Sequence, residues 1–447
     1  MRKKNKIIIF SSLIVLLIVT AIILCIFIKD DVKVVEEPKP VQIINVSNST
    51  INNFSVTKEG EYYTTMCVDG NWFSPENPQA YLDSEYILNM INTLSTLSAI
   101  PVEENAKDFS VYGLDNPASL FEFNDENGVK YTLKFGNKVP TGSGYYLAYN
   151  DVPNVYKISD EDYTLLCGGF DSIRNKKLFA IKPNDVYSVS ITNSDTSFMV
   201  RPKTVHDPNA HSSSQWEMST PYLKDVNQYI FETNILNAID FTIYDFVDDN
   251  PTDYSQYGLD TPKYTIKVST MSNNLEINFL LGNSYFSTDG TKLIYMMVQG
   301  VPNVFAIKED QVAYKDSTPV DILDSLVFSR IISCVDTISY SDANNSYTLK
   351  INEPNFYVDG NAVEEGEFRS AYTKIISPTI LGEVEGDVGN QMCSMTFNYN
   401  TSTPSETVVF YEYGDLYAAV KINERTQFYV SKSSVNDMMD AINNLLK

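Results

Sequence analysis

The stretch Tyr112-Gly113-Leu114-Asp115-Asn116-Pro117 decides how this chain is organised, because it returns later as Tyr257-Gly258-Leu259-Asp260-Thr261-Pro262. Two further pairs follow in the same order: Gly136-Asn137 with Gly282-Asn283, and Val152-Pro153-Asn154-Val155-Tyr156 with Val301-Pro302-Asn303-Val304-Phe305. Matching order and spacing over such a length indicate a duplicated domain.

Each copy contains the pattern of one helix followed by strands. Asp83 has the character of an N-cap, and the apolar residues from Tyr86 to Leu97 share one helical stripe; residues 230–239 repeat that pattern. The period then changes to two in Leu120–Phe123 and Tyr131–Phe135, which predicts a β-hairpin. The sequence therefore predicts an α+β fold class, with tandem repeats of antiparallel sheet and a packed helix after an N-terminal transmembrane helix.

The two tryptophans, Trp72 and Trp216, fall at equivalent points of the two copies. A third, degenerate copy begins at Val335–Tyr340, with Phe356 near the tryptophan position and a helix at the C-terminus. The expected divisions are a cytoplasmic tail (1–6), the transmembrane helix (7–28), a spacer (29–50), two repeat domains (51–183 and 184–330) and a degenerate repeat domain (331–447).

The N-terminal segment predicts membrane attachment. Arg2, Lys3, Lys4 and Lys6 precede an uncharged, largely apolar stretch over residues 7–28, which is long enough to cross a bilayer. Basic residues before it and Asp30 and Asp31 after it predict a cytoplasmic N-terminus and an extracytoplasmic bulk. The run continues through Ile28 without small residues, which argues against a cleaved signal peptide.

Charge excludes one class of partner. The chain has 33 basic and 57 acidic residues and a net charge of -24, and such a surface repels nucleic acid and anionic lipid. Four cysteines lie beyond the apolar segment, Cys67, Cys167, Cys334 and Cys393; they form no CxxC pair, and the sequence leaves open whether they are disulfide-bonded or free.

Candidate catalytic and metal-binding residues are few. His206 and His211, with Asp207 between them, could ligate a metal, but their spacing through a proline favours an exposed loop. Gly142-Ser143-Gly144 lies between predicted strands, which favours a hairpin turn over a phosphate loop. The pairs Glu103-Glu104 and Asp248-Asp249 could be catalytic carboxylates, yet each is typical of a solvated polar loop.

The repeated YGLD-x-P element is interpreted as a structural corner in preference to a recognition loop. Gly113 and Gly258 can take positive φ, and Asp115 and Asp260 can accept hydrogen bonds from nearby amides. No catalytic, cofactor-binding or metal residues are therefore predicted.

These motifs, together with Arg174-Asn175-Lys176-Lys177-Leu178-Phe179, resemble an uncharacterised bacterial family of membrane-anchored repeat proteins often encoded beside gliding-motility-type ABC transporters. The second copy departs from that block at Asp324–Phe328, which lacks its basic residues. The resemblance implies a non-catalytic extracytoplasmic accessory or scaffold protein in the cell membrane, with integral membrane partners such as ABC permease subunits. The alternative is a protein that binds or hydrolyses cell-wall polysaccharide in a cleft between repeats.

Overall fold

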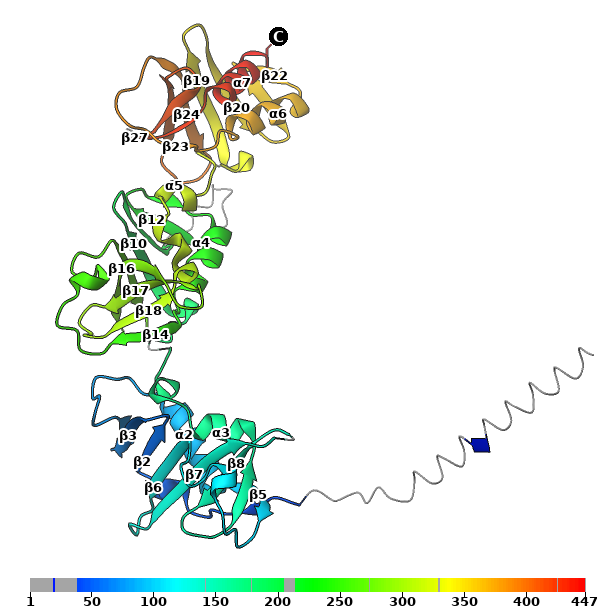
Figure 1. Cartoon of the computed structure of the whole chain (residues 1–447). Coiled ribbons are helices and arrows are strands. Elements are labelled where there is room, and N and C mark those ends of the chain that lie inside the picture. The colour runs from blue at the N-terminus through cyan, green and yellow to red at the C-terminus, as the bar shows by residue number, and fades with distance from the viewer. Residues whose placement is uncertain are drawn as a thin grey trace, which may run out of the picture. The chain divides into compact units, whose positions relative to one another are not determined.

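The computed structural model describes residues 19–20, 38–140, 142–177, 179–204, 214–272, 274–328, 330–423 and 425–446. The chain divides into two compact units (Figure 1): Met1–Pro78 with Leu82–Arg174, and Gln79–Tyr81 with Asn175–Lys447. The first unit holds one nine-stranded sheet and the second holds two.

The first sheet has the strand order β1-β5-β9-β8-β7-β6-β2-β3-β4, and every pair is antiparallel. Its strands are β1 (Val41–Gln42), β2 (Asn53–Lys58), β3 (Glu61–Val68), β4 (Asn71–Phe73), β5 (Ser98–Glu103), β6 (Ser119–Asn124), β7 (Lys130–Lys138), β8 (Tyr145–Tyr149) and β9 (Val155–Ile158). Its α-helices are α2 (Ser84–Ser95) and α3 (Asp160–Leu166).

The second sheet has the order β13-β12-β11-β10-β15-β16-β17-β18-β14. Its elements are β10 (Val186–Thr192), β11 (Ser197–Pro202), β12 (Trp216–Thr220), β13 (Lys224–Asp225), α4 (Gln228–Asn234), β14 (Ile243–Asp248), β15 (Tyr264–Thr270), β16 (Glu276–Phe286), β17 (Lys292–Val298), β18 (Val304–Lys308) and α5 (Pro319–Ile322).

The third sheet has the order β22-β21-β20-β19-β24-β25-β26-β27-β23. Its elements are β19 (Val335–Asp342), β20 (Ser346–Asn352), β21 (Asn355–Val358), β22 (Asn361–Val363), α6 (Glu365–Ile375), β23 (Gly382–Glu383), β24 (Gln391–Tyr399), β25 (Glu406–Tyr413), β26 (Tyr417–Ile422), β27 (Arg425–Ser431) and α7 (Lys432–Asn443).

The three sheets share one plan. In each, the first strand of the copy (β2, β10 or β19) pairs on one side with the strand that follows it and on the other with the strand that begins a four-stranded meander (β6, β15 or β24). A helix (α2, α4 or α6) lies between these two halves in the chain, and the strand after that helix pairs with the last strand of the meander. The third segment therefore repeats the fold although it lacks the YGLD sequence.

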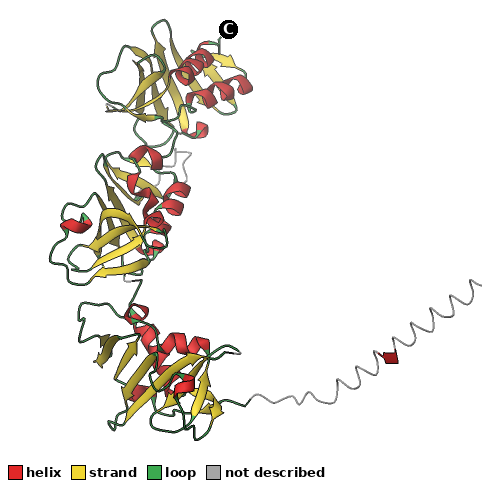
Figure 2. Cartoon of the chain, in the orientation of Figure 1, coloured by secondary structure: helices red, strands yellow, loops and turns green. Residues whose placement is uncertain are grey.

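The helices cover one face of each sheet (Figure 2), where the main core lies. Helix α2 begins as predicted, because the Asp83 carboxylate accepts hydrogen bonds from the amides of Glu85 and Tyr86, each at 3.0 Å. Its buried residues include Ile87, Met90 and Leu94, which are fully covered by the sheet. Alternate residues of the strands, such as Phe121 and Phe123 in β6, supply the other half of the core.

The predicted fold class is wrong. An α+β protein with an N-terminal transmembrane helix was expected, but the described chain is mainly β: three nine-stranded antiparallel sheets beside α-helices of no more than 12 residues. Strand pairing accounts for the difference, since it joins sequence-distant segments such as β2 and β6 and gathers every short extended run into a sheet. Of the expected span 7–28, all but Val19 and Thr20 lies outside the described residues, and no helix that the structure describes is long and apolar enough to cross a membrane.

The predicted duplication is confirmed, and the aromatic markers fall in corresponding strands. Trp72 lies in β4, Trp216 in β12 and Phe356 in β21, which pair with the corresponding strands β3, β11 and β20. Trp216 is buried, whereas Trp72 is half-buried. Residues expected in the spacer contribute to the first unit, because Val41 and Gln42 form β1 and Ile44 is buried in the core.

Candidate functional site

The YGLD element and the Gly-Asn element, separate in the sequence, pack together in the first sheet. Gly113 has φ 69°, and a Cβ there would lie 2.6 Å from Oδ1 of Asn137. A Cβ on Gly136 would lie 2.2 Å from the carbonyl oxygen of Tyr112. A side chain at either glycine would collide with the other motif, which explains why the two motifs recur together.

The second sheet repeats this corner closely. Gly258 has φ 69°, and a Cβ there would lie 2.7 Å from Oδ1 of Asn283. A Cβ on Gly282 would lie 2.1 Å from the carbonyl oxygen of Tyr257. Asp253 accepts hydrogen bonds from the amide and the hydroxyl of Ser255, both at 2.8 Å, just as Asp108 does from Ser110 in the first sheet.

The corner covers the sheet face opposite the helices. Ala148 and Val155 alternate with core residues along their strands, and they are buried in a small separate cluster with Leu114 of the YGLD element. In the second sheet Leu259 is likewise buried, as are Val304 and Ala306. These observations agree with the structural interpretation of YGLD, and Asp115 also accepts from the amide of Asn116 at 3.0 Å.

The carboxylate pairs beside this corner bind its tyrosines and asparagines. The Tyr112 hydroxyl donates to Glu103, which raises the pKa of Tyr112, and Tyr257 donates to Asp248 at 3.1 Å. Asp249 accepts from Nδ2 of Asn303 at 2.7 Å, which ties the third repeated motif to the corner. Asp248 and Asp249 face different partners, so these two carboxylates do not act together as one site.

The other sequence candidates fall in turns, in the core or outside the described residues. Gly142–Gly144 lies in the β7–β8 hairpin, whose Val139 amide donates to the Gly144 carbonyl at 2.9 Å. His206, Asp207 and His211 lie outside the described residues. Within the described chain, no group of three His, Cys, Asp or Glu side chains is placed to hold a metal ion.

The structure shows for three of the four cysteines that they are not disulfide-bonded. Cys67, Cys167 and Cys393 are free thiols, and Cys167 and Cys393 are buried. Burial raises the pKa of Cys393 to about 12 and that of Cys167 further, so neither is an activated nucleophile at neutral pH.

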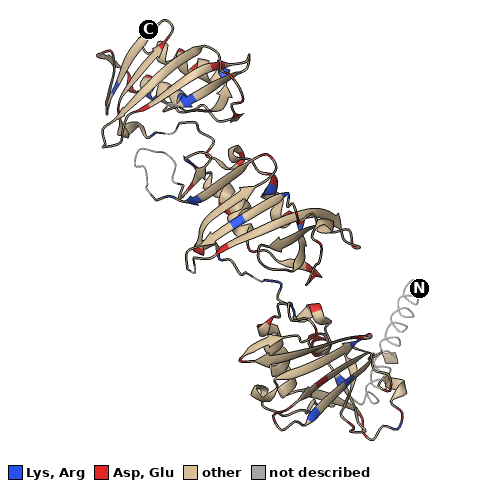
Figure 3. Ribbon diagram, turned by 90° about the vertical axis from the view of Figure 1, so that its left-hand side faces the viewer, with Lys and Arg blue, Asp and Glu red and all other residues tan. Residues whose placement is uncertain are grey.

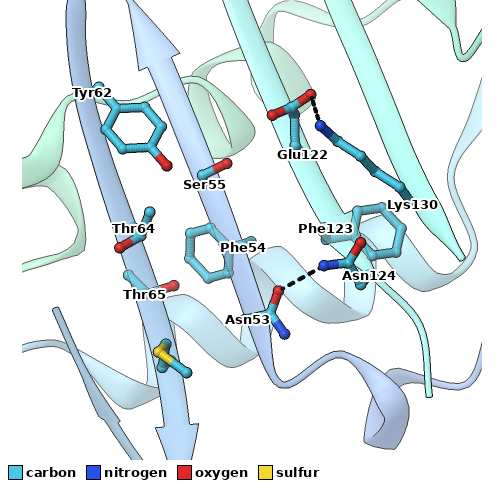
Figure 4. Close-up of a pocket in the computed structure, with 11 residues that line it drawn as sticks. Asn53, Phe54, Ser55, Tyr62, Thr64, Thr65, Glu122, Phe123, Asn124 and Lys130 are labelled. Atoms are coloured by element: carbon cyan, nitrogen blue, oxygen red, sulfur yellow. Dashed lines mark hydrogen bonds and ion pairs between the residues drawn. The ribbon is translucent and has the colours of Figure 1, made fainter. Parts of the chain in front are cut away.

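A hollow of about 360 Å³ lies on the open face of the first sheet (Figure 4). Tyr62, Ser55 and Glu122 follow one another across neighbouring strands, and Lys130 reaches back to Oε1 of Glu122 at 2.7 Å. Thr132 also donates to Oε1 of Glu122, at 3.2 Å. The ion pair leaves Oε2 of Glu122 without a protein partner among the described residues.

Strand register creates this hollow. Ser55 pairs with Thr64 on one side and with Glu122 on the other, so two short side chains stand in one row. The longer Tyr62 and Met66 flank Thr64 on β3 and are exposed by 58% and 43%. Thr65, fully buried behind this row, also lines the hollow, and its hydroxyl has no hydrogen-bond partner in the described chain.

A second hollow, of about 380 Å³, shares Tyr62 with the first. Glu76 lines it and accepts from the Thr64 hydroxyl at 2.6 Å and from the Ser74 hydroxyl at 3.1 Å. Burial acts to raise the pKa of Glu76, but these hydrogen bonds outweigh it and hold the pKa below its usual value. Glu76 is therefore an ionised acceptor at neutral pH.

Comparison with known proteins defines the family. The model for a domain of unknown function, DUF4340, matches residues 72–210 and 216–359. The chain belongs to this family. No curated protein matches the DUF4340 chain. A solved structure, the glycoside hydrolase, family 43 YxiA protein from Bacillus licheniformis, aligns at 9% identity over 88% of this chain and 99% of that chain; its TM-score of 0.08 supports no inference.

The DUF4340 unit is offset from the structural repeat. Each match begins at a tryptophan, in β4 or in β12, and ends among the first strands of the following sheet. Lys, Arg, Asp and Glu are scattered over the strands and loops of all three sheets (Figure 3). Sequence reasoning did not find the two hollows, because the residues that line them come from strands whose register has no sequence signature.

Proposed function

We propose that this DUF4340 protein is a non-catalytic accessory or scaffold protein. It works outside the cytoplasm and is attached to the cell membrane through residues 7–28. Its partners are integral membrane proteins, and permease subunits of an ABC-type transporter are the first candidates.

The repetition of one sheet plan carries this proposal. Three sheets share one plan and differ only in which edge carries an additional short strand, and each has one face covered by helices, so the chain presents closely similar architecture three times. Tandem domains suit contacts with large partners, because several weak contacts on one chain act together. Attachment at the membrane would raise the effective concentration of the chain beside integral partners. Location and partner class come from the sequence: the basic residues before the apolar segment, and the resemblance stated above.

Cross-linking in the native membrane tests the proposal. The full chain would carry a photoreactive amino acid at an exposed position of each repeat, for example Leu88 in α2, Tyr229 in α4 and Leu416 in the β25–β26 turn. After irradiation and purification, permease subunits should be recovered. A second chain, with residues 7–28 replaced by an unrelated membrane-spanning sequence, shows whether the segment itself is recognised. Absence of any membrane partner, together with saturable turnover by the purified chain, would replace this proposal with an enzyme.

A further inference from the structure

Two hollows lie beside the exposed ring of Tyr62, and each is lined by both polar and apolar side chains. Tyr62 lines both, and the hollows of about 360 and 380 Å³ each fall within the size range of small-ligand sites, roughly 300 to 1,000 Å³. Because Tyr62 lines both hollows, a ligand that occupies both at once also contacts Tyr62. An extended, chain-like ligand therefore fits better than a compact one.

Charge and hydrogen-bonding groups narrow the chemistry of that ligand. The charged side chains that line the two hollows are Lys58, Lys130, Glu61, Glu76 and Glu122, so the surface is close to neutral. Strongly anionic ligands have little to bind here, and the chain as a whole, at -24, repels them. Cationic ligands find Glu122 already paired with Lys130 at 2.7 Å.

The polar groups around the ring suit hydroxyl groups. Oε2 of Glu122 and the carboxylate of Glu76 accept hydrogen bonds, the Asn53 amide both donates and accepts, and the Ser55 and Tyr62 hydroxyls do either. A pyranose ring carries C–H groups on one face, which pack on an aromatic ring, and hydroxyl groups around its rim. An aromatic side chain with a ring of such polar groups matches both parts of a sugar.

We propose that the two hollows beside Tyr62 in the first unit bind an uncharged polysaccharide chain, with sugar units in both hollows and one unit stacked on Tyr62. The surface binds and does not cleave. Glycoside hydrolysis needs a carboxylic acid that is protonated at neutral pH, whereas hydrogen bonds lower the pKa of Glu76.

This site does not depend on the proposed membrane partners. Residues 7–28 take no part in it, so cross-linking to permease subunits and binding of sugars can fail separately. A Tyr62 variant that loses sugar binding should still capture the same membrane proteins.

Fluorescence anisotropy with labelled chitohexaose and cellohexaose, titrated with the purified full chain, tests the proposal. Saturable binding of at least one of them is expected. Tyr62→Ala should weaken it by about tenfold or more, while Tyr62→Phe, which keeps the ring, should stay within about threefold. Ser55→Phe fills the first hollow without removing the ring and should also weaken binding.

Tyr187→Ala is the matched control, because Tyr187 is a similarly exposed strand tyrosine, at 51%, in the second sheet. It should bind as the parent does. The proposal is overturned if neither sugar binds, if Tyr62→Ala binds as tightly as the parent, or if Tyr187→Ala loses as much. It is also overturned if polygalacturonate binds more tightly than the neutral sugars, or if chitohexaose or cellohexaose is shortened during incubation.

Discussion

The corner glycines of the second sheet allow backbone conformation and close packing to be separated. Gly258 has both a positive φ of 69° and a close contact, since a Cβ would lie 2.7 Å from Asn283. Gly282 has only the contact, 2.1 Å from the Tyr257 carbonyl oxygen, and Gly300 has only the positive φ, of 87°, with open space around it. Alanine at Gly300 therefore tests the cost of positive φ, alanine at Gly282 tests the cost of close packing, and alanine at Gly258 tests both.

The expected losses of stability differ in a defined order. Gly300→Ala should cost about 1 kcal/mol, the penalty for an L residue in the left-handed region. Gly282→Ala should cost about 2 to 3 kcal/mol, because a backbone carbonyl must shift to admit the methyl group. Gly258→Ala combines the φ penalty with displacement of a side chain and should also cost about 2 to 3 kcal/mol.

A single tryptophan can report the second unit without a signal from the first. In a Trp72→Phe background, Trp216 is the remaining tryptophan, and its buried ring packs 4.9 Å from that of Phe231. Urea titrations followed by its fluorescence should report unfolding of the second unit separately from the first, which matters because a multidomain chain is not a two-state system. If Gly258→Ala and Gly282→Ala cost no more than Gly300→Ala, the packing of YGLD against Gly-Asn is not what fixes these glycines.

Three further predictions concern titratable groups. Burial acts to raise the pKa of Asp342, but hydrogen bonds from Asn443 and Tyr340 hold it at about 2. The stability that this carboxylate contributes is therefore present above its usual pKa and is lost as the pH falls toward 2. Asp342→Asn should remove that loss from urea midpoints measured between about pH 6 and 2.5. Without reductant, iodoacetamide should modify Cys67 much faster than the buried Cys167 and Cys393 in the native chain, and all three after unfolding, as read by mass spectrometry. Burial lowers the pKa of Lys224, whose Nζ donates to the Leu326 carbonyl at 2.7 Å. Lys224→Met should cost about 1 to 3 kcal/mol because that carbonyl loses its donor, and Lys224→Asp should cost more because it buries a carboxylate beside Asp225 and Asp324, as read by the same urea titration.

Local structure was predictable where one short segment decides it. The Asp83 cap, the β6–β7 hairpin and the positive φ of Gly113 and Gly258 all follow from neighbours in the chain, and the structure confirms each. The sheet was not predictable in the same way. Phe54 pairs with Phe123, and Val189 with Val268, although a helix and several strands separate them in the sequence. The sequence of neither strand indicates which strand it pairs with.

The hollows were missed for the same physical reason. Ser55 and Thr64 are ordinary strand residues in the sequence, and they form a depression only because the register sets them side by side between Tyr62 and Glu122. A one-residue slip of β3 would turn Tyr62 and Thr64 to the other face and remove the depression. The exposed Tyr62 was the one signal available, in a segment where alternation places Tyr63 inside and Tyr62 outside.

The third sheet shows what the YGLD corner contributes to the fold. Ala419 lies in β26, the strand equivalent to β8, and is fully buried although it alternates with the core residues Ala418 and Val420. Its register partners on that face are Tyr411 and Tyr429, so tyrosine side chains flank it where a YGLD loop covers Ala148 in the first sheet. The shared sheet plan therefore forms whether that face is covered by a YGLD loop or by tyrosine side chains. Because the fold does not require the loop, its presence in the first two sheets reflects how that face is covered there, and the sheet plan itself is set by the alternating core residues that all three segments share.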